Sequence, residues 1–382
     1  MGSDVRQPIR VLQVVRPAVG GMKGHVLQLA TGLRAHGFDC EIACPGDSGL
    51  VHDALEANVL VHPVPIVGPL HPLRDPFAII ALREVIHERR PAIIHAHGSK
   101  AGLIARIASR LAGCAPTVVT VHNQVLYGGI SPLMRRVYIT LERWLARQTA
   151  RIITVSDALR MELLDVYGLP ARLVTTVHNG LDLSPFLKGG DGPAARRRYG
   201  VPADALAFGL AARFAPQKAH DVLIDAAVPV LERDERVWLL LAGDGPLLEA
   251  ARTKARATRV RDRILFPGFE TDVPGLLASL DVYVSPAIAE GLGLATIEAM
   301  AAGLPVVATT AGGTPEVVES GVTGVLVLPG RPAPLTEALN GLLRDPALRR
   351  SMGEAGRARA VAEFGEDRML ERIAEVYREV LG

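Results

Sequence analysis

The alternation of short apolar runs with helical stretches constrains the fold of this chain more than any other feature. In the first half, strand-length runs are separated by longer segments with apolar residues at helical spacing, such as 25–36. The expected strands are 10–15, 40–44, 92–96, 117–121 and 151–155. Strands that alternate with helices form βαβ units, whose strands are parallel. We therefore predict an α/β fold with a doubly wound parallel sheet.

A Gly/Pro cluster at 188–193 interrupts this series and has the composition of a linker. A second α/β series follows, with expected strands at 207–210, 237–241, 263–266, 282–285, 305–308 and 324–327. The expected last helix is 366–381. The chain is thus predicted to contain two α/β domains, 1–187 and 188–365, and a C-terminal helix within 366–382. Ligands of open α/β sheets bind beyond the carboxyl ends of the strands, so functional residues are expected there.

Composition excludes several classes of protein. Hydrophobic residues make up 49% and aromatic residues 4% of the 382 residues, which fits an aliphatic core of buried parallel strands. A net charge of +2 argues against a nucleic-acid-binding protein that relies on bulk charge. Three cysteines without metal-site spacing, no signal peptide and no apolar run of membrane-spanning length lead us to expect a cytoplasmic protein.

The nine residues 290–298 combine two carboxylates with a glycine-rich turn. They follow the expected strand 282–285 and lead into an apolar helix, in which we place Glu298 about two turns from the start. A turn of this kind presents free backbone N–H groups and the positive end of the helix dipole to an anion. Glu290 and Glu298 at its two ends can accept hydrogen bonds from hydroxyls. Together these features predict a nucleotide-sugar site, whose backbone contacts come from Gly291, Leu292, Gly293 and Leu294.

Other residues at expected strand ends fit the same ligand. Arg213 and Lys218 stand five residues apart on a proline-bearing loop, and a guanidinium with an ammonium suits a diphosphate. Gly243 opens a turn after the strand 237–241, and Gly20 and Gly21 form another anion-friendly turn after the first strand. The Gly243 turn also has a purely structural interpretation, and Arg213 and Lys218 could also be two surface cations.

These motifs resemble retaining glycosyltransferases of the GT4 type. The 290–298 stretch resembles the E-x7-E signature, 212–218 the G-R-x-x-P-Q-K-G element, 243–246 the G-D-G-P turn and 120–122 the T-x-H element. The resemblance implies a GT-B fold of two Rossmann-like domains facing a cleft, with the last helix crossing back onto the first domain. The second domain would bind the donor and the first the acceptor.

The resemblance also implies roles for individual residues. Arg213 and Lys218 would hold the donor diphosphate, Glu290 the sugar hydroxyls and Glu298 the ribose. His122 would lie near the reacting sugar, and the backbone around Gly268 would receive the base. The loop of Gly20 and Gly21 would approach the donor phosphates. Alanines at 212 and 219 replace the family's usual glycines, which bears on the backbone angles of that loop.

The run 95–102 resembles the H-x-H-x-S-K-A-G element of GT4 enzymes that act on polysaccharide or lipid-linked acceptors. His97, Ser99 and Lys100 are therefore candidate acceptor-binding residues, with Ser99 as a helix N-cap the alternative. Lys23 could also meet an acidic acceptor. His95 and His97 share one face of a strand, but we identify no third ligand and expect no metal and no other cofactor.

The stretch 134–151 is rich in arginine and carries a tryptophan, so it reads either as a helix on an anionic membrane surface or as a solvated helix with an ordinary core face. The predicted function is transfer of a sugar from a nucleoside-diphosphate sugar, UDP favoured, to a lipid-linked or polysaccharide acceptor in cell-envelope glycan synthesis. A nucleotide-sugar epimerase and a non-catalytic sugar-nucleotide-binding protein are the alternatives. The expected partners include no nucleic acid.

Overall fold

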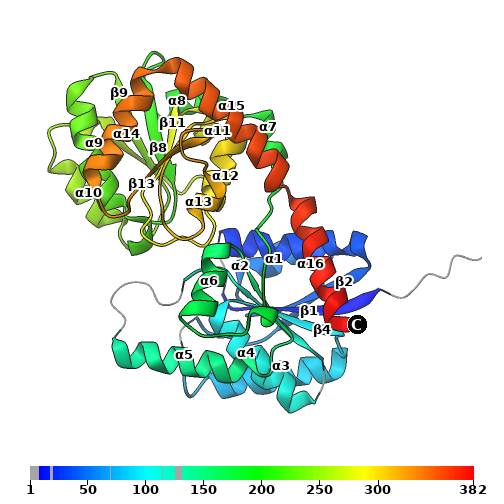
Figure 1. Cartoon of the computed structure of the whole chain (residues 1–382). Coiled ribbons are helices and arrows are strands. Elements are labelled where there is room, and N and C mark those ends of the chain that lie inside the picture. The colour runs from blue at the N-terminus through cyan, green and yellow to red at the C-terminus, as the bar shows by residue number, and fades with distance from the viewer. Residues whose placement is uncertain (1–7, 18–19, 69, 114, 125–130) are drawn as a thin grey trace, which may run out of the picture. The chain divides into compact units, whose positions relative to one another are not determined.

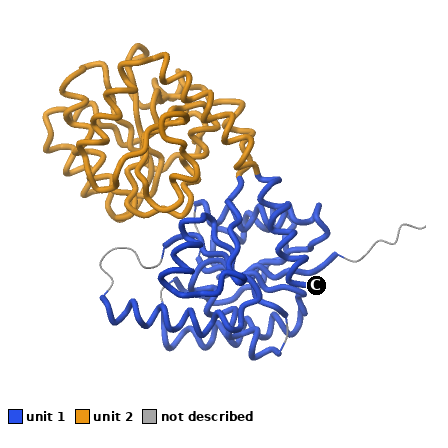
Figure 2. Tube along the Cα trace, in the orientation of Figure 1, with its two compact units in different colours: residues 1–180, 366–382 blue, residues 181–365 orange. Residues whose placement is uncertain are grey.

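The computed structural model describes residues 8–17, 20–68, 70–113, 115–124 and 131–382, which form two compact units (Figure 2). Unit 1 contains Met1–Gly180 and Glu366–Gly382, and unit 2 contains Leu181–Gly365. Residues 181–187, which the sequence analysis assigned to the first domain, therefore belong to unit 2. The Gly/Pro cluster that we expected to be a linker packs closely inside this unit. A Cβ on Gly192, for example, would lie 2.3 Å from the Ala278 carbonyl oxygen.

Unit 1 is built on a seven-stranded parallel sheet with the order β3-β2-β1-β4-β5-β6-β7. Its strands are β1 (Ile9–Val15), β2 (Phe38–Cys44), β3 (Val61–Pro63), β4 (Ile93–His97), β5 (Thr117–Val121), β6 (Arg151–Thr154) and β7 (Val174–Thr176). Its helices are α1 (Gly21–Gly32), η1 (Leu33–His36), α2 (Gly49–Glu56), α3 (Asp75–Arg89), α4 (Gly98–Ala112), α5 (Pro132–Ala146), α6 (Asp157–Asp165), η2 (Ala171–Leu173) and α16 (Glu366–Leu381) (Figure 1).

Unit 2 has a six-stranded parallel sheet with the order β10-β9-β8-β11-β12-β13. Its strands are β8 (Leu206–Ala211), β9 (Val237–Ala242), β10 (Ile264–Gly268), β11 (Val282–Ser285), β12 (Val306–Thr309) and β13 (Gly324–Val327). Its helices are α7 (Ser184–Lys188), α8 (Gly192–Tyr199), η3 (Pro216–Lys218), α9 (His220–Arg233), α10 (Leu248–Arg256), η4 (Arg261–Arg263), α11 (Val273–Ala278), α12 (Leu294–Ala301), α13 (Thr314–Val317), α14 (Pro332–Arg344) and α15 (Pro346–Glu363).

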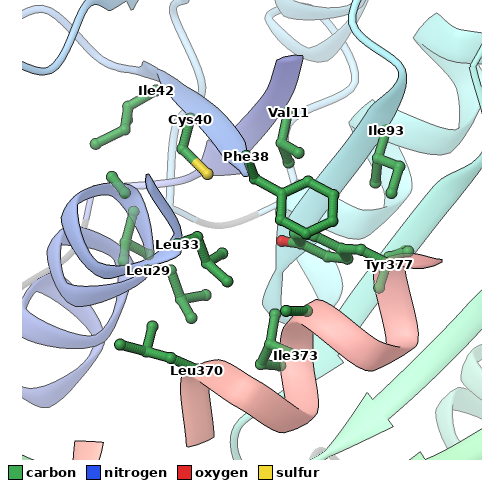
Figure 3. Close-up of a cluster of buried hydrophobic side chains, with 14 of the residues drawn as sticks. Val11, Leu29, Leu33, Phe38, Cys40, Ile42, Ile93, Leu370, Ile373 and Tyr377 are labelled. Carbon is green, nitrogen blue, oxygen red and sulfur yellow. The ribbon is translucent and has the colours of Figure 1, made fainter. Parts of the chain in front are cut away.

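Helix α16 completes the core of unit 1 although it follows unit 2 in the sequence. Its residues Leu370, Ile373 and Tyr377 pack with β1, β2 and α1 in one buried cluster (Figure 3). The Tyr377 ring meets Phe38 edge to face, with 5.2 Å between the ring centroids. The amphipathic spacing that predicted this helix therefore reflects burial against the first sheet.

The strand order of each sheet reverses at one point. In unit 1, β1 lies between β2 and β4, and in unit 2, β8 lies between β9 and β11. Loops at the carboxyl ends of such neighbouring strands diverge and leave room for a ligand. In unit 2 the loops that follow β8 and β11 meet at this point, where Ile288 N donates to the Gln217 carbonyl.

Among the described residues, no helix combines the length and the apolar character needed to cross a bilayer. Cys40 and Cys44 are buried free thiols, whereas Cys114 lies outside the described residues.

Candidate functional site

The strand-order reversal of unit 2 brings together the two loops that carry the predicted diphosphate and sugar ligands. The Lys218 ammonium donates to Glu290 Oε2 at 2.5 Å, and the two side chains come from the loops after β8 and β11. A backbone bond from Ile288 N to the Gln217 carbonyl, 2.9 Å long, ties the same loops together. Arg213, five residues before Lys218, is exposed at the end of β8. Two cations and one carboxylate thus share one edge of the sheet.

The alanines that replace glycine in this loop have different consequences. Ala219 adopts a left-handed backbone conformation, with φ of 47° and ψ of 46°, immediately before α9. This conformation costs a non-glycine residue about 1 kcal/mol. Ala212 does not have a positive φ. The loop therefore keeps the backbone geometry that glycine would favour at one of the two positions and stores strain there.

The glycine turn before α12 has the geometry expected of an anion site. Gly293 is the N-cap residue, with φ of 102°, and Leu294 begins the helix. The first turn of a helix leaves backbone N–H groups without intrahelical partners, and these groups attract a negative charge. Gly291 and Leu292 are buried beside them. Because α12 begins at Leu294, Glu298 lies one turn into the helix, so the predicted two turns were wrong.

Gly312, which the sequence did not indicate, packs against the backbone of this turn. Gly312 has φ of 51°, and a Cβ at this position would lie 1.8 Å from the Glu290 carbonyl oxygen. The backbones of the β11 and β12 loops are therefore in contact, and any side chain at position 312 would displace Glu290.

The turns after β9 and β10 join the same edge. Gly243 N donates to the Gly268 carbonyl at 2.7 Å, and Phe214 N donates to the Asp244 carbonyl at 2.9 Å. A Cβ on Gly243 would lie 2.0 Å from the Ala212 carbonyl oxygen, so this position requires glycine for packing. The predicted donor residues of unit 2 thus belong to one continuous set of strand-end loops.

The carboxyl group of Glu298 is unusual because burial raises its pKa to about 7. Tyr283 of β11 is fully buried nearby, and burial together with the charges of Glu298 and Glu290 raises the pKa of its phenol well above the usual range. Near neutral pH, Glu298 therefore exists in both protonation states and can either accept or donate a hydrogen bond.

In unit 1, four histidines gather at the carboxyl ends of β4 and β5. His97 Nδ1 lies 3.2 Å from His122 Nε2, and His97 Nε2 donates to Gln13 Oε1 at 2.8 Å. His25 of α1 packs edge-on against the rings of His97 and His122, with centroid distances of 5.5 and 4.9 Å. His95 completes the set, with its ring centroid 4.3 Å from that of His97. Burial lowers the pKa of all four imidazoles, to about 4 for His122 and about 3 for His95.

This cluster bears on the expectation of no metal. His25, His97 and His122 offer ring nitrogens within 4.8 Å of one another, so the fold supplies the further ligands that the sequence analysis did not identify. Both nitrogens of His97 are already engaged in hydrogen bonds. A metal ion held by all three residues would have to replace at least one of these bonds.

The candidate acceptor residues have different surroundings from those expected. His97 is fully buried and both its nitrogens are bonded, so it is not available to an acceptor. The Lys100 ammonium is buried in an ion pair with Asp75 of α3. Lys23 of α1 pairs with Asp53 of α2 at 2.5 Å, which neutralises the charge that we assigned to an acceptor. Ser99 is not an N-cap, because His97 occupies that position of α4.

Ser99 and Lys100 line a cavity of about 240 Å³ in unit 1. Its wall is mainly apolar and comes from β5, α4, α5 and α6, with Leu103, Val119, Val121, Leu141, Leu145, Leu159 and Leu163 among its residues. The polar side chain of Asn123 lines it next to His122 in the sequence. The cavity thus has an apolar body and polar groups that include the two acceptor candidates.

Helix α5 covers part of this cavity and corresponds to the basic stretch of the sequence. Its N-cap Ser131 accepts a hydrogen bond from Met134 N at 3.3 Å. Arg135 and Arg136 are exposed, as are the apolar side chains Leu133, Met134, Val137 and Trp144. Only Leu145 and Ala146 at its end are fully buried. The helix therefore presents both basic and apolar side chains to its surroundings.

Sequence reasoning missed His25, Gln13 and Tyr377. Gln13 lies in an apolar strand and His25 in an apolar helix face, and Tyr377 is separated from both by most of the chain. The one available signal was a polar residue within an otherwise buried run, as at Gln13, because a buried polar side chain needs a partner.

Comparison with known proteins agrees with this arrangement. Residues 19–185 match the family described as Glycosyltransferase Family 4, and residues 192–359 match Glycosyl transferases group 1. The chain is 32% identical to the D-inositol 3-phosphate glycosyltransferase of Actinosynnema mirum, over 94% of this chain and 92% of that protein. It is 26% identical to the UDP-Gal:alpha-D-GlcNAc-diphosphoundecaprenol alpha-1,3-galactosyltransferase of Escherichia coli, over 94% of each.

Solved structures share the fold. The crystal structure of HepE of Anabaena in complex with UDP-glucose superimposes with a TM-score of 0.84 and 25% identity, over 97% of this chain and 100% of that one. With two parallel-sheet units, strand-end loops that carry the family's motifs and relatives that span its length, the chain belongs to the GT4 family and is a glycosyltransferase of GT-B fold.

Proposed function

We propose that this glycosyltransferase moves a sugar from a UDP-sugar to a lipid-linked acceptor, with retention of anomeric configuration, in the synthesis of a cell-envelope glycan. The observation that carries the donor half is the contact between Lys218 and Glu290 at the strand-order reversal of unit 2. In this contact a cation that would hold the diphosphate lies beside a carboxylate that would hold the sugar hydroxyls. HepE, whose structure was determined with UDP-glucose, and the UDP-Gal-dependent relative from E. coli support UDP as the nucleotide.

The chemistry of the donor site relies on fixed positive charge. As the diphosphate leaves, negative charge grows on its oxygens, and Arg213, Lys218 and the N–H groups at the start of α12 would stabilise it. Glu290 would hold the sugar and Glu298 the ribose, which fixes the reacting carbon relative to these charges. Because these groups supply the required positive charge, we propose transfer without a metal ion. Activity that survives chelation by EDTA supports this part.

The acceptor half rests on unit 1. The cavity lined by Ser99, Lys100 and Asn123 has an apolar body that suits hydrocarbon next to the sugar-bearing head of an acceptor. Exposed arginines and apolar side chains on α5 suit an anionic membrane surface, on which a lipid-linked acceptor resides. The name of the E. coli relative includes a diphosphoundecaprenol acceptor. These observations favour a lipid-linked acceptor over a soluble one and a protein located at the cytoplasmic membrane surface.

The first experiment is to measure nucleoside-diphosphate release from UDP-, GDP- and ADP-sugars, with and without bacterial lipid extract. We expect release from a UDP-sugar that rises when extract is added. Release that rises with a water-soluble sugar phosphate and not with extract would contradict a lipid-linked acceptor and indicate a soluble one. NMR of the product then tests retention through the anomeric configuration of the new bond.

The role of Glu290 has its own test. Glu290→Ala should lose turnover while the protein remains folded, because the sugar hydroxyls lose the carboxylate that would accept their hydrogen bonds. Glu249→Ala is the matched control, since Glu249 is an exposed carboxylate of α10 in the same unit. Normal transfer by the Glu290 variant would remove this residue from the mechanism.

A further inference from the structure

A chain of buried polar side chains connects α16 to His122. Tyr377 Oη lies 2.6 Å from His95 Nδ1, and His95 Nε2 lies 2.7 Å from Thr120 Oγ1. Gln13 Nε2 donates to Tyr377 Oη at 3.1 Å, and Gln13 Oε1 accepts from His97, which in turn contacts His122. All of these side chains lie on the face of the unit 1 sheet that α1 and α16 cover. The chain joins four elements that are distant in the sequence.

The direction of the hydrogen bonds in this chain is determined by Gln13. Its amide nitrogen carries two hydrogens and faces two groups that can accept them, Tyr377 Oη and, at 3.6 Å, Cys40 Sγ. The amide oxygen faces His97 Nε2. Tyr377 then has its single hydrogen left for His95 Nδ1, which fits the 2.6 Å contact.

The direction of these hydrogen bonds also determines the tautomer of His122, through its contact with His97. Burial keeps these imidazoles neutral, so each has one N–H and one unprotonated nitrogen. His97 Nε2 carries the hydrogen that Gln13 Oε1 accepts, so His97 Nδ1 is unprotonated and must accept from His122 Nε2. His122 Nδ1 is then unprotonated as well. This atom makes no hydrogen bond to the described residues, and His122 is 9% exposed.

We propose that Gln13, held by Tyr377, is a positioning residue that fixes His122 as the Nε2–H tautomer, so that His122 Nδ1 accepts a hydrogen bond from a sugar hydroxyl. The tautomer is a property of unit 1 alone. Only the identity of the hydroxyl rests on the proposed function. A residue of β1 and a residue of the C-terminal helix thereby determine whether the histidine is an acceptor or a donor.

The tautomer can be measured directly in the full-length protein labelled with ¹⁵N-histidine. Long-range ¹H–¹⁵N correlation spectra distinguish protonated from unprotonated ring nitrogens, and the spectrum of His122→Asn identifies the His122 signals. We expect a protonated Nε2 and an unprotonated Nδ1 for His122. A proton on Nδ1, or signals averaged between the two tautomers, overturns the proposal whether or not a donor sugar has been found.

Two variants test the direction of the chain. Gln13→Leu removes the amide, and Tyr377→Phe keeps the ring but removes the hydroxyl that accepts from Gln13. In whichever of the two variants folds correctly, we expect the His122 nitrogen signals to move toward each other as both tautomers become populated. Gln28→Leu on α1 makes the same substitution at a residue outside this hydrogen-bond network and should leave the His122 signals unmoved. Signals that stay at their wild-type positions in folded Gln13 or Tyr377 variants overturn the proposal.

The kinetic expectation is separate from the spectra. Loss of the fixed acceptor should lower kcat roughly tenfold, the effect of one neutral hydrogen bond, and leave KM for the nucleotide sugar unchanged because the donor residues of unit 2 are untouched. A tautomer shift without any change in kcat would leave Gln13 as a positioning residue and remove the sugar hydroxyl from the proposal. An absence of transfer in wild type would instead count against the proposed function.

Discussion

At the scale of the residue, the proposed donor site depends most on the charge of Lys218. Its ammonium contacts Glu290, and the charge is not needed for core packing because the side chain is partly exposed. We expect Lys218→Ala to lower kcat/KM by roughly 10²- to 10³-fold, since a fixed charge opposite the developing diphosphate is lost. Steady-state release of nucleoside diphosphate measures this.

The matched control is Lys254→Ala, which removes an ammonium that pairs with Asp225 on the surface of the same unit. This variant should retain wild-type kinetics. Equal losses in the two variants would indicate an effect of net charge and contradict the assignment of Lys218 to the diphosphate.

The raised pKa of Glu298 leads to a prediction about pH and stability. In the folded protein the pKa is about 7 instead of the usual 4.5, so the folded state binds the proton more tightly than the unfolded state. The stability from this group is therefore present at low pH and is lost as pH rises through about 7. Glu298→Gln cannot ionise, so the variant should gain stability over wild type by about 2 kcal/mol between about pH 5.5 and about pH 8.

Urea unfolding followed by fluorescence can isolate unit 2 for this measurement. The chain has two tryptophans, Trp144 in α5 and Trp238 in β9, so Trp144→Phe leaves a single reporter in unit 2. Glu249→Gln in the same background removes an exposed carboxylate and should show no such divergence from its parent. A constant difference between the Glu298 variant and its parent at all pH values would mean that this carboxyl has an ordinary pKa.

At the scale of the element, the sequence predicted strands and helices better than their contacts. Apolar runs located five of the seven strands of unit 1 and all six strands of unit 2 within a few residues, because a buried parallel strand is continuously apolar. The edge strands β3 and β7 were missed, since each has only three residues. The motif at 290–298 located the α12 turn, because the turn needs glycine. By contrast, the partners of Lys23 and Lys100 are carboxylates on other helices, Asp53 and Asp75, and no local pattern indicates them.

The histidine cluster also shows that local sequence patterns do not indicate contacts between distant elements. The spacing of His95 and His97 correctly placed both on one face of β4. His25 joins them only because α1 returns over the sheet, and Tyr377 only because α16 does. Such contacts depend on topology, so the sequence singled out three of the four histidines, His95, His97 and His122, while the fold supplied His25 and Tyr377.

Helix α5 is the element whose exposed face calls for an explanation. We expect the double variant Arg135→Glu with Arg136→Glu to bind anionic vesicles about 30-fold more weakly than wild type, since each basic residue near such a surface contributes about 1 kcal/mol. Co-sedimentation with phosphatidylglycerol-containing vesicles measures this. Arg256→Glu with Arg259→Glu makes the same charge change on exposed positions of unit 2 and should retain binding. Equal loss in both variants would mean that bulk charge, and not α5, attracts the protein.

At the scale of the whole molecule, unit 2 is an insertion between Gly180 and Glu366 of unit 1. The two ends of the insertion are close, because Gly180 N contacts Met369 Sδ at 3.1 Å. We expect residues 8–180 joined by a short Gly/Ser linker to 366–382 to fold without unit 2. The buried cluster of β1, β2, α1 and α16 would be complete in that protein. Cooperative urea unfolding, followed by Trp144 fluorescence, tests this.

The matched comparison is residues 8–180 without the helix. Its core would expose the surfaces that Leu370, Ile373 and Tyr377 cover, each worth about 1.5–3 kcal/mol of burial. Gln13 and His95 would also lose their hydroxyl partner inside the core, which adds the cost of unpaired polar groups. We therefore expect this fragment to lack a cooperative transition. If it unfolded with the same midpoint as the joined protein, α16 would be dispensable to unit 1, and the helix could no longer be what holds the hydrogen-bond chain to His122 in place.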